Sequence, residues 1–251
     1  MIFRRPNFLA RNGKDRKTAM RWIGLFVGVC AFFQGFLSMG FQLVATRLLA
    51  PFFGSTLFVW SFVIATFLAA FSVGAILGGL FSQLGAKRLM AYLVALVAAG
   101  FVGYFVTATQ GHAILQLVDS SFDNAFLALG LSCLFLFFFP VVCLSALLPI
   151  FTEALVSSGS RGGMSTGVVY GISTLGNITG VMVTAFLLIP SFPTSTILQG
   201  WTAAAAICFV MFIWLIGRAA PQMAANVPLE FRAKSFPGSG QAGRQPSRGS
   251  P

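Results

Sequence analysis

Charged residues are scarce in this sequence: Asp, Glu, Lys and Arg make up only 8% of its 251 residues. A soluble domain carries roughly a quarter charged residues, because they cover the surface that faces water. The sequence is instead 57% hydrophobic and contains 29 Phe. The shortage of charge therefore excludes an ordinary soluble domain and predicts a protein whose solvent is mainly lipid.

Groups that bind metals or act as nucleophiles are also few. The single His, His112, falls in a polar stretch in which we expect a loop. The four Cys lie in apolar stretches and form no C-x-x-C pair, a pattern typical of small buried hydrophobic residues; they are Cys30, Cys133, Cys143 and Cys208. We therefore expect no metal centre, no cofactor and no catalytic triad.

Long apolar stretches, by contrast, are abundant. About 20 apolar residues cross the roughly 30 Å hydrocarbon core of a bilayer. Six stretches reach that length: residues 22–46, 57–83, 89–109, 124–153, 164–190 and 195–217. Residues 1–21 lack a short apolar region followed by a small-residue cleavage site, and the first apolar stretch is full length, so we expect a retained span and not a signal peptide. The sequence predicts an all-α bundle of six transmembrane helices, with Pro140 and Pro149 interrupting the fourth.

Basic residues are distributed unevenly along the chain, which has a net charge of +11. With six spans, one side of the membrane receives 15 of the 16 Lys and Arg residues, and the other side receives only Arg47. This asymmetry predicts that both termini are cytoplasmic, as in a multi-pass protein of the bacterial inner membrane. The basic clusters flank the apolar body and form no groove-lining pattern with aromatic residues, so we expect them to meet anionic lipid and not nucleic acid. They lie in residues 1–21, at Lys87 and Arg88, at Arg161, and from Arg218 onward.

The two ends of the chain differ from its apolar body. Residues 1–21 are polar and basic, and we expect them to form a cytoplasmic tail. Residues 218–251 are rich in Gly, Pro, Ser, Gln and Arg. Such a segment buries too little apolar surface to offset the entropy of ordering, so we expect a second, disordered cytoplasmic tail.

Polar side chains inside the spans are candidates for a site, because each is costly in lipid without a partner. Gln34 and Gln42 share one face of the first span, and Arg47 follows near its outer end. Arg47 either reaches out to the membrane surface or lines a vestibule where it holds an anion. In the fifth span, Asn177 needs a partner from a neighbouring helix or from a bound solute, and Tyr170 lies two turns away. These five residues are the candidate solute-binding residues.

Glycine and proline indicate where helices approach or end. Pro51 and Gly54 are expected to end the first helix and turn the chain before Trp60. Pairs of glycines four residues apart predict flat strips where helix backbones come close. Such strips serve packing within one bundle, a dimerisation face, or a surface on which halves slide; the pairs are Gly24/Gly28, Gly74/Gly78, Gly167/Gly171 and Gly176/Gly180.

Several motifs resemble one known family. They are SMGFQLVATRLLAPFFGSTLFVW (38–60), FLAAFSVGAILGGL (67–80), FPVVCLSALLPIFTEAL (139–155) and STGVVYGISTLGNITGVMVTAFLLIP (165–190). In this order they are similar to the membrane domain of the bacterial fused transporter-like/spermidine synthase family, the membrane-bound aminopropyltransferase-like proteins. The resemblance implies a helical module like half of a major-facilitator transporter, ahead of a cytoplasmic synthase domain.

The sequence also departs from that family. It shows no glycine-rich nucleotide loop after a strand and no acidic pair for an amine substrate, so the aminopropyl-transfer activity does not carry over and no enzyme is expected. Gln42 stands where relatives often carry an acid, which puts binding of a polyamine cation in doubt.

Two functions remain open from the sequence. The first is a transporter-like module for a small polar solute, working as a homodimer because one six-span half does not enclose a central site. It requires Arg47, Gln42 and Asn177 to converge on one cavity. The second is a membrane scaffold for a separately encoded, soluble synthase-like enzyme, bound through a cytoplasmic surface that includes Lys87, Arg88 and Arg161. A third reading, an intramembrane enzyme, lacks any nucleophile–base pair.

Overall fold

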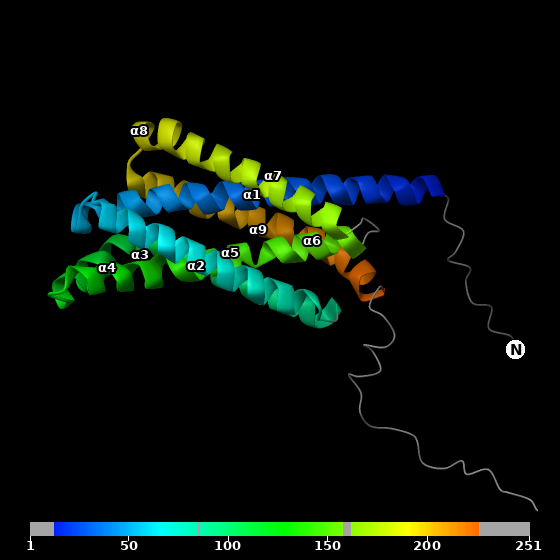
Figure 1. Cartoon of the computed structure of the whole chain (residues 1–251), viewed down its shortest axis with the longest axis horizontal. Coiled ribbons are helices and arrows are strands. Elements are labelled where there is room, and N and C mark those ends of the chain that lie inside the picture. Colours follow the sequence, from blue (N-terminus) through cyan, green and yellow to red (C-terminus); the bar gives the residue numbers. More distant parts are fainter. Residues whose placement is uncertain (1–12, 85, 158–161, 226–251) are drawn as a thin grey trace, which may run out of the picture.

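The computed structural model describes residues 13–84, 86–157 and 162–225 (Figure 1). Within these ranges there are no strands, and six helical stretches are long and apolar enough to cross a membrane. The prediction of an all-α bundle with six spans is therefore confirmed. The chain is a multi-pass helical membrane protein, and lipid is its environment.

Four of the six spans belong to single helices. These are α1 (Gly13–Phe53), α2 (Leu57–Ser82), α3 (Ala86–Ser121) and α9 (Thr194–Ala225). The fourth span is divided into α4 (Ala125–Cys133), the π-helix η1 (Leu134–Phe138), α5 (Phe139–Ser145) and α6 (Leu147–Ser157). The fifth span consists of α7 (Gly162–Val183), the π-helix η2 (Thr184–Leu188) and the short α8 (Ile189–Ser191).

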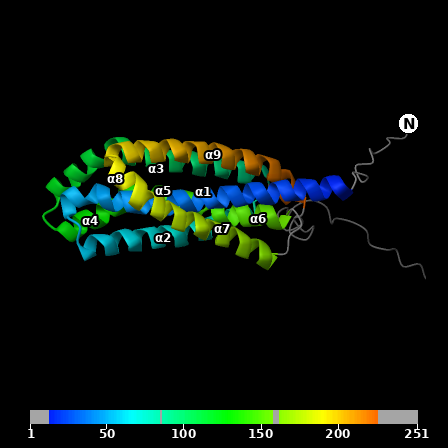
Figure 2. The ribbon, with the colours of Figure 1, turned by 90° about the horizontal axis from the view of Figure 1, so that it is seen from above.

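Helix α1 forms the centre of the bundle and contacts elements of all five other spans (Figures 1 and 2). Its side chains Phe41, Val44 and Leu49 are almost fully buried. The ring of Phe41 packs against Tyr104 and Phe137, at centroid distances of 4.6 and 5.8 Å. Because α1 is surrounded in this way, the first span provides much of the core around which the other helices pack.

The bundle has two distinct ends. At one end, called here the Arg47 end, lie the connections 54–56, 122–124 and 192–193. At the opposite end, called the terminal end, α1 begins and α9 ends (Figure 1). This up-and-down arrangement follows directly from six spans joined by short connections.

The backbones of α1 and α7 approach closely at glycines. An added Cβ at Gly35 would come within 2.9 Å of the carbonyl carbon of Ser173, and one at Gly176 would come equally close to that of Phe32. Gly180 faces Phe36 in the same way, and on the other side of the bundle Gly74 and Gly78 face the end of α5. A side chain at any of these positions would hold the helices apart, so glycine permits the packing.

The other glycines of the predicted strips make no contact with a neighbouring backbone among the described residues. A Cβ at Gly167 or Gly171 would meet no described atom within 4 Å, whereas one at Gly24 would lie 3.8 Å from Leu155, and one at Gly28 would make a tighter contact of 3.3 Å with Ile172. Four-residue glycine spacing in this chain therefore marks both internal contacts and an open face of α7.

The fourth span is broken where its prolines require it. Pro140 has no N–H to donate to the carbonyl of Leu136, four residues earlier. The Thr107 hydroxyl of α3 lies 2.8 Å from that oxygen and donates to it, sharing its hydrogen with Gly103 O. A turn at Ala146 separates α5 from α6, three residues before the half-buried Pro149. Helix α3 thus supplies, through Thr107, the hydrogen bond that Pro140 cannot make.

At the Arg47 end, α1 and α3 run farther than the apolar stretches indicated. Helix α1 continues past residue 46 and through Pro51, because Leu48 and Leu49 are buried in the core, and it ends at Phe53. Gly54 then has φ +73° and its N–H donates to Ala50 O, a left-handed cap that terminates the helix.

Helix α3 extends to Ser121, twelve residues past the expected end, so His112 lies in a helix and the expected loop there was wrong. The fully buried Leu115 anchors this extension, and polar residues alone do not stop a helix that has such an anchor.

The terminal segments are also partly helical. Helix α1 begins at Gly13, within the segment expected to be a tail, and α9 continues to Ala225, past residue 217. The expectation of disorder is therefore wrong for residues 218–225. The remaining parts of both predicted tails, residues 1–12 and 226–251, lie outside the described residues.

Candidate functional site

Three of the five candidate solute-binding residues line one pocket near the middle of the spans. This pocket, called here the middle pocket, has a volume of about 340 Å³. Helix α1 forms its floor, α2 and α7 form its walls, and α5 and α6 contribute one residue each. Its lining residues are Gln34, Ser38, Phe71, Ser72, Ala75, Ser145, Leu148, Tyr170, Ser173, Thr174 and Asn177.

Gln34 connects the floor of the middle pocket to one wall. Its amide oxygen accepts a hydrogen bond of 2.9 Å from Ser173 on α7, and its amide nitrogen donates to Ser38 at 3.3 Å. The Ser38 hydroxyl in turn donates to the backbone oxygen of Gln34 at 2.9 Å. Gln34 is only 3% exposed, so these bonds satisfy a polar group that would otherwise be costly in the membrane.

The walls of the middle pocket carry polar groups that remain available. Asn177 is half-buried and Tyr170 is 42% exposed. Among the described residues, neither side chain forms a hydrogen bond, and the same holds for the Ser72 hydroxyl on the opposite wall. An amide and two hydroxyls thus face a cavity that lies between helices.

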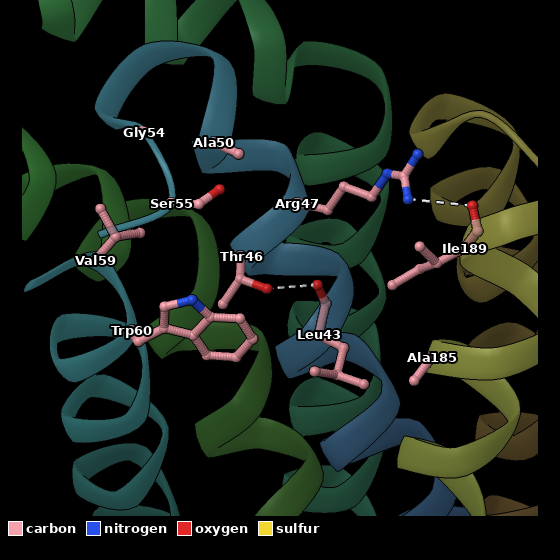
Figure 3. A pocket seen from close by; sticks show the side chains of 10 residues that line it. All are labelled: Leu43, Thr46, Arg47, Ala50, Gly54, Ser55, Val59, Trp60, Ala185 and Ile189. Atoms are coloured by element: carbon pink, nitrogen blue, oxygen red, sulfur yellow. Dashed lines mark hydrogen bonds between the residues drawn. The ribbon is translucent and has the colours of Figure 1, made fainter. Parts of the chain in front are cut away.

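Arg47 lines a second pocket, of about 400 Å³, at the Arg47 end (Figure 3). This pocket, called here the Arg47 pocket, has the same floor, α1, and lies between the start of α2 and the η2–α8 segment. Figure 3 shows the Arg47 side chain extending toward Ile189, with Trp60 and Ser55 on the other side of the pocket. Its lining residues are Leu43, Thr46, Arg47, Ala50, Gly54, Ser55, Val59, Trp60, Ala185 and Ile189.

A hydrogen bond fixes the position of Arg47. Its guanidinium donates to the carbonyl oxygen of Ile189 at 3.1 Å (Figure 3). Helix α8 ends at Ser191, and Pro193, four residues after Ile189, has no N–H that could donate to the Ile189 oxygen. Arg47 therefore caps a helix end, where a cation also meets the negative end of the helix dipole.

The remaining candidate residues lie in different places. Gln42 is half-buried and lines neither pocket, so Arg47, Gln42 and Asn177 do not converge on one of these cavities. Arg88 is exposed at the terminal end. The side chain of Lys87 and all of Arg161 lie outside the described residues, and the predicted partner surface stays a prediction.

Sequence reasoning did not select Ser72 and Ser145, which complete the middle pocket. Each is a single small hydroxyl in an apolar span, a pattern that also occurs in ordinary packing. Ser145 illustrates the ambiguity, because its hydroxyl lies 3.2 Å from Ala70 O and 3.1 Å from Val142 O. Only the arrangement of α2, α5 and α7 around α1 distinguishes such residues from others of the same type.

The fold and the two pockets define a class of protein: a six-span helical membrane protein with cavities between its helices that are lined in part by polar residues. Comparisons with protein-family models, with characterised proteins and with solved structures gave no match. The resemblance to the spermidine synthase-like membrane family, and the likeness to a half-transporter, therefore remain predictions from the sequence. Among the described residues, no group of three His, Cys, Asp or Glu is placed to hold a metal ion.

Proposed function

We propose that this protein is a transporter-like membrane module that binds a small polar solute in the middle pocket. The expected convergence of Arg47, Gln42 and Asn177 on one cavity is not met, and the proposal rests instead on the polar residues that line the middle pocket. One observation carries the proposal: Gln34, Tyr170 and Asn177, from two different helices, face the same cavity inside the membrane. Polar residues in such positions are costly and commonly mark substrate pathways. The Gln34–Ser173 bond makes part of this site rigid, while Tyr170 and Asn177 keep free hydrogen-bonding groups.

The lining of the middle pocket indicates the chemistry of the solute. An amide and hydroxyls both donate and accept hydrogen bonds, and none of the described Asp and Glu residues lines the cavity. These groups suit a neutral polar solute better than a polyamine, whose several positive charges require nearby carboxylates. A volume of 340 Å³ lies at the small end of the range for ligand pockets, which favours a small solute.

The working unit that we propose is a homodimer in the bacterial inner membrane, with both termini cytoplasmic. The middle pocket lies between α2 and α7, which are two of the least buried spans. A second copy placed over these helices would enclose the pocket, as the second half of a transporter does. The excess of basic residues at the terminal end supports the cytoplasmic orientation.

A thermal-shift screen of the purified protein in nanodiscs tests this function. The panel contains amino acids, nucleosides, organic anions and polyamines. A ligand at about 100 times its dissociation constant stabilises the folded state by roughly 2.7 kcal/mol. Asn177→Leu should abolish the shift. The matched control Thr179→Val should retain it, because that hydroxyl bonds Leu175 O in its own helix and lines neither pocket.

Two results would speak against solute binding in the middle pocket. One is the same ligand shift in Asn177→Leu as in the wild type. The other is no shift with any member of the panel. The second result would favour the scaffold function, for which the next measurement is capture of a soluble synthase-like partner and its loss in Arg88→Glu.

A further inference from the structure

The Arg47 pocket is lined by several side chains that donate hydrogen bonds and by few that accept them. The Arg47 guanidinium has five N–H groups and donates only, and one of them bonds Ile189 O. Trp60 Nε1–H and the Ser55 hydroxyl make no hydrogen bond with any described residue. The Thr46 hydroxyl already donates to Leu43 O at 2.7 Å. Most of the donors in this pocket are therefore free.

The positive charge of this pocket forms no ion pair with any described carboxylate. None of the described Asp and Glu residues lines the pocket. Asp119 lies near the same end but lines a neighbouring cavity beside Phe52 and Phe126. The first turn of the 26-residue helix α2 also borders the Arg47 pocket, and its N–H groups add positive potential.

The bond to Ile189 O holds the exposed Arg47 guanidinium beside the pocket. A guanidinium with unused N–H groups is a planar fork that can donate two hydrogen bonds to the oxygens of a carboxylate or phosphate. Trp60, on the opposite side, is 39% exposed and of the type that lies at the level of lipid headgroups. The pocket thus combines a fixed cation, neutral donors and a position near the membrane surface.

We propose that the Arg47 pocket is an oxyanion site, which binds a phosphate or carboxylate group between α1, the start of α2 and α8. Arg47 provides the charge, and Ser55 and Trp60 donate the additional hydrogen bonds. The oxyanion belongs either to a free solute or to the headgroup of a phospholipid. This site is separate from the middle pocket and does not depend on the solute proposed to bind there.

Two measurements on the full-length protein test the site and its source of oxyanion. The first follows the unfolding temperature in detergent as inorganic phosphate replaces chloride at constant ionic strength. The second uses native mass spectrometry to detect phosphatidylglycerol that stays bound. Arg47→Gln should weaken either form of binding about tenfold or more, because a hydrogen-bonded charge is lost. Arg88→Gln, which removes an exposed charge at the opposite end, should change neither.

A second variant separates binding from folding, because Arg47→Gln also removes the bond to Ile189. The double variant Ser55→Ala/Trp60→Phe keeps that bond and should weaken binding about threefold to tenfold. A phosphate shift without a lipid adduct assigns the site to free oxyanions, and an Arg47-dependent adduct assigns it to a headgroup. The proposal is overturned if neither signal occurs in the wild type, or if the double variant binds like the wild type.

Discussion

The close approach of α1 and α7 leads to a prediction for a single methyl group. In Gly176→Ala, the new Cβ would lie 2.9 Å from the carbonyl carbon of Phe32 and nearer still to its oxygen, whereas ordinary contact begins at 3.4 Å. The two helices must therefore separate by at least 0.5 Å along this contact. The separation would also lengthen the Gln34–Ser173 hydrogen bond at the floor of the middle pocket.

The expected loss of stability in Gly176→Ala is the difference between two opposing contributions. Forcing a methyl group into a well-packed contact costs about 1–3 kcal/mol. Alanine recovers up to about 1 kcal/mol relative to glycine through its higher helix propensity. We therefore expect Gly176→Ala to lower the free energy of unfolding by roughly 1–2 kcal/mol. Gly171→Ala is the matched control, because its Cβ meets nothing within 4 Å; it should be neutral or slightly stabilising.

The assay is unfolding by SDS in mixed micelles, followed through tryptophan fluorescence. One of the four Trp that contribute to this signal is the buried Trp201, whose indole donates to Leu37 O on α1. The midpoint should shift to lower SDS in Gly176→Ala and not in Gly171→Ala. Equal midpoints for the two variants would refute the reasoning that backbone contact at Gly176 holds α1 and α7 together.

Further predictions concern single polar groups within the helices. Thr107→Val removes the donor to Leu136 O and should destabilise the fold by about 0.6–2 kcal/mol. Thr109→Val is the control and should not destabilise the fold, because the Thr109 hydroxyl donates only to its own helix. Equal losses in the two variants would contradict the interhelical role of Thr107. Gln34→Leu should cost about 1–2 kcal/mol in the same SDS titration, because Ser173 loses its acceptor. Gln42→Leu should change the midpoint little, and a larger loss than for Gln34→Leu would show an unrecognised partner.

Part of the candidate site was accessible from the sequence. Gln34, Tyr170 and Asn177 stand out because an amide or phenol is rare in an apolar span, and the structure places all three at one cavity. The spacing of Gln34 and Gln42 by two turns suggested a shared face. However, the sequence does not show which part of a helix face is covered by a neighbouring helix. In the structure, Gln42 lines neither pocket.

The role of Arg47 shows a second limit. Its isolation from all other basic residues is visible in the sequence and indicated a special position. The partner of its guanidinium, the carbonyl of Ile189, lies 142 positions away along the chain. A backbone oxygen carries no sequence signal, so only the packing of α8 beside α1 reveals it.

The sequence by itself determined the environment and the number of spans of this protein. Both depend on summed properties, namely the apolar length that crosses a bilayer and the scarcity of charge, and such sums do not require knowledge of contacts. The tertiary structure alone decided which glycines are contacts, since Gly176 meets a backbone and Gly171 meets nothing. It also decided that Asn177 and Arg47 belong to different pockets. These outcomes depend on which helices are neighbours, and helices of similar hydrophobicity do not specify their neighbours through composition.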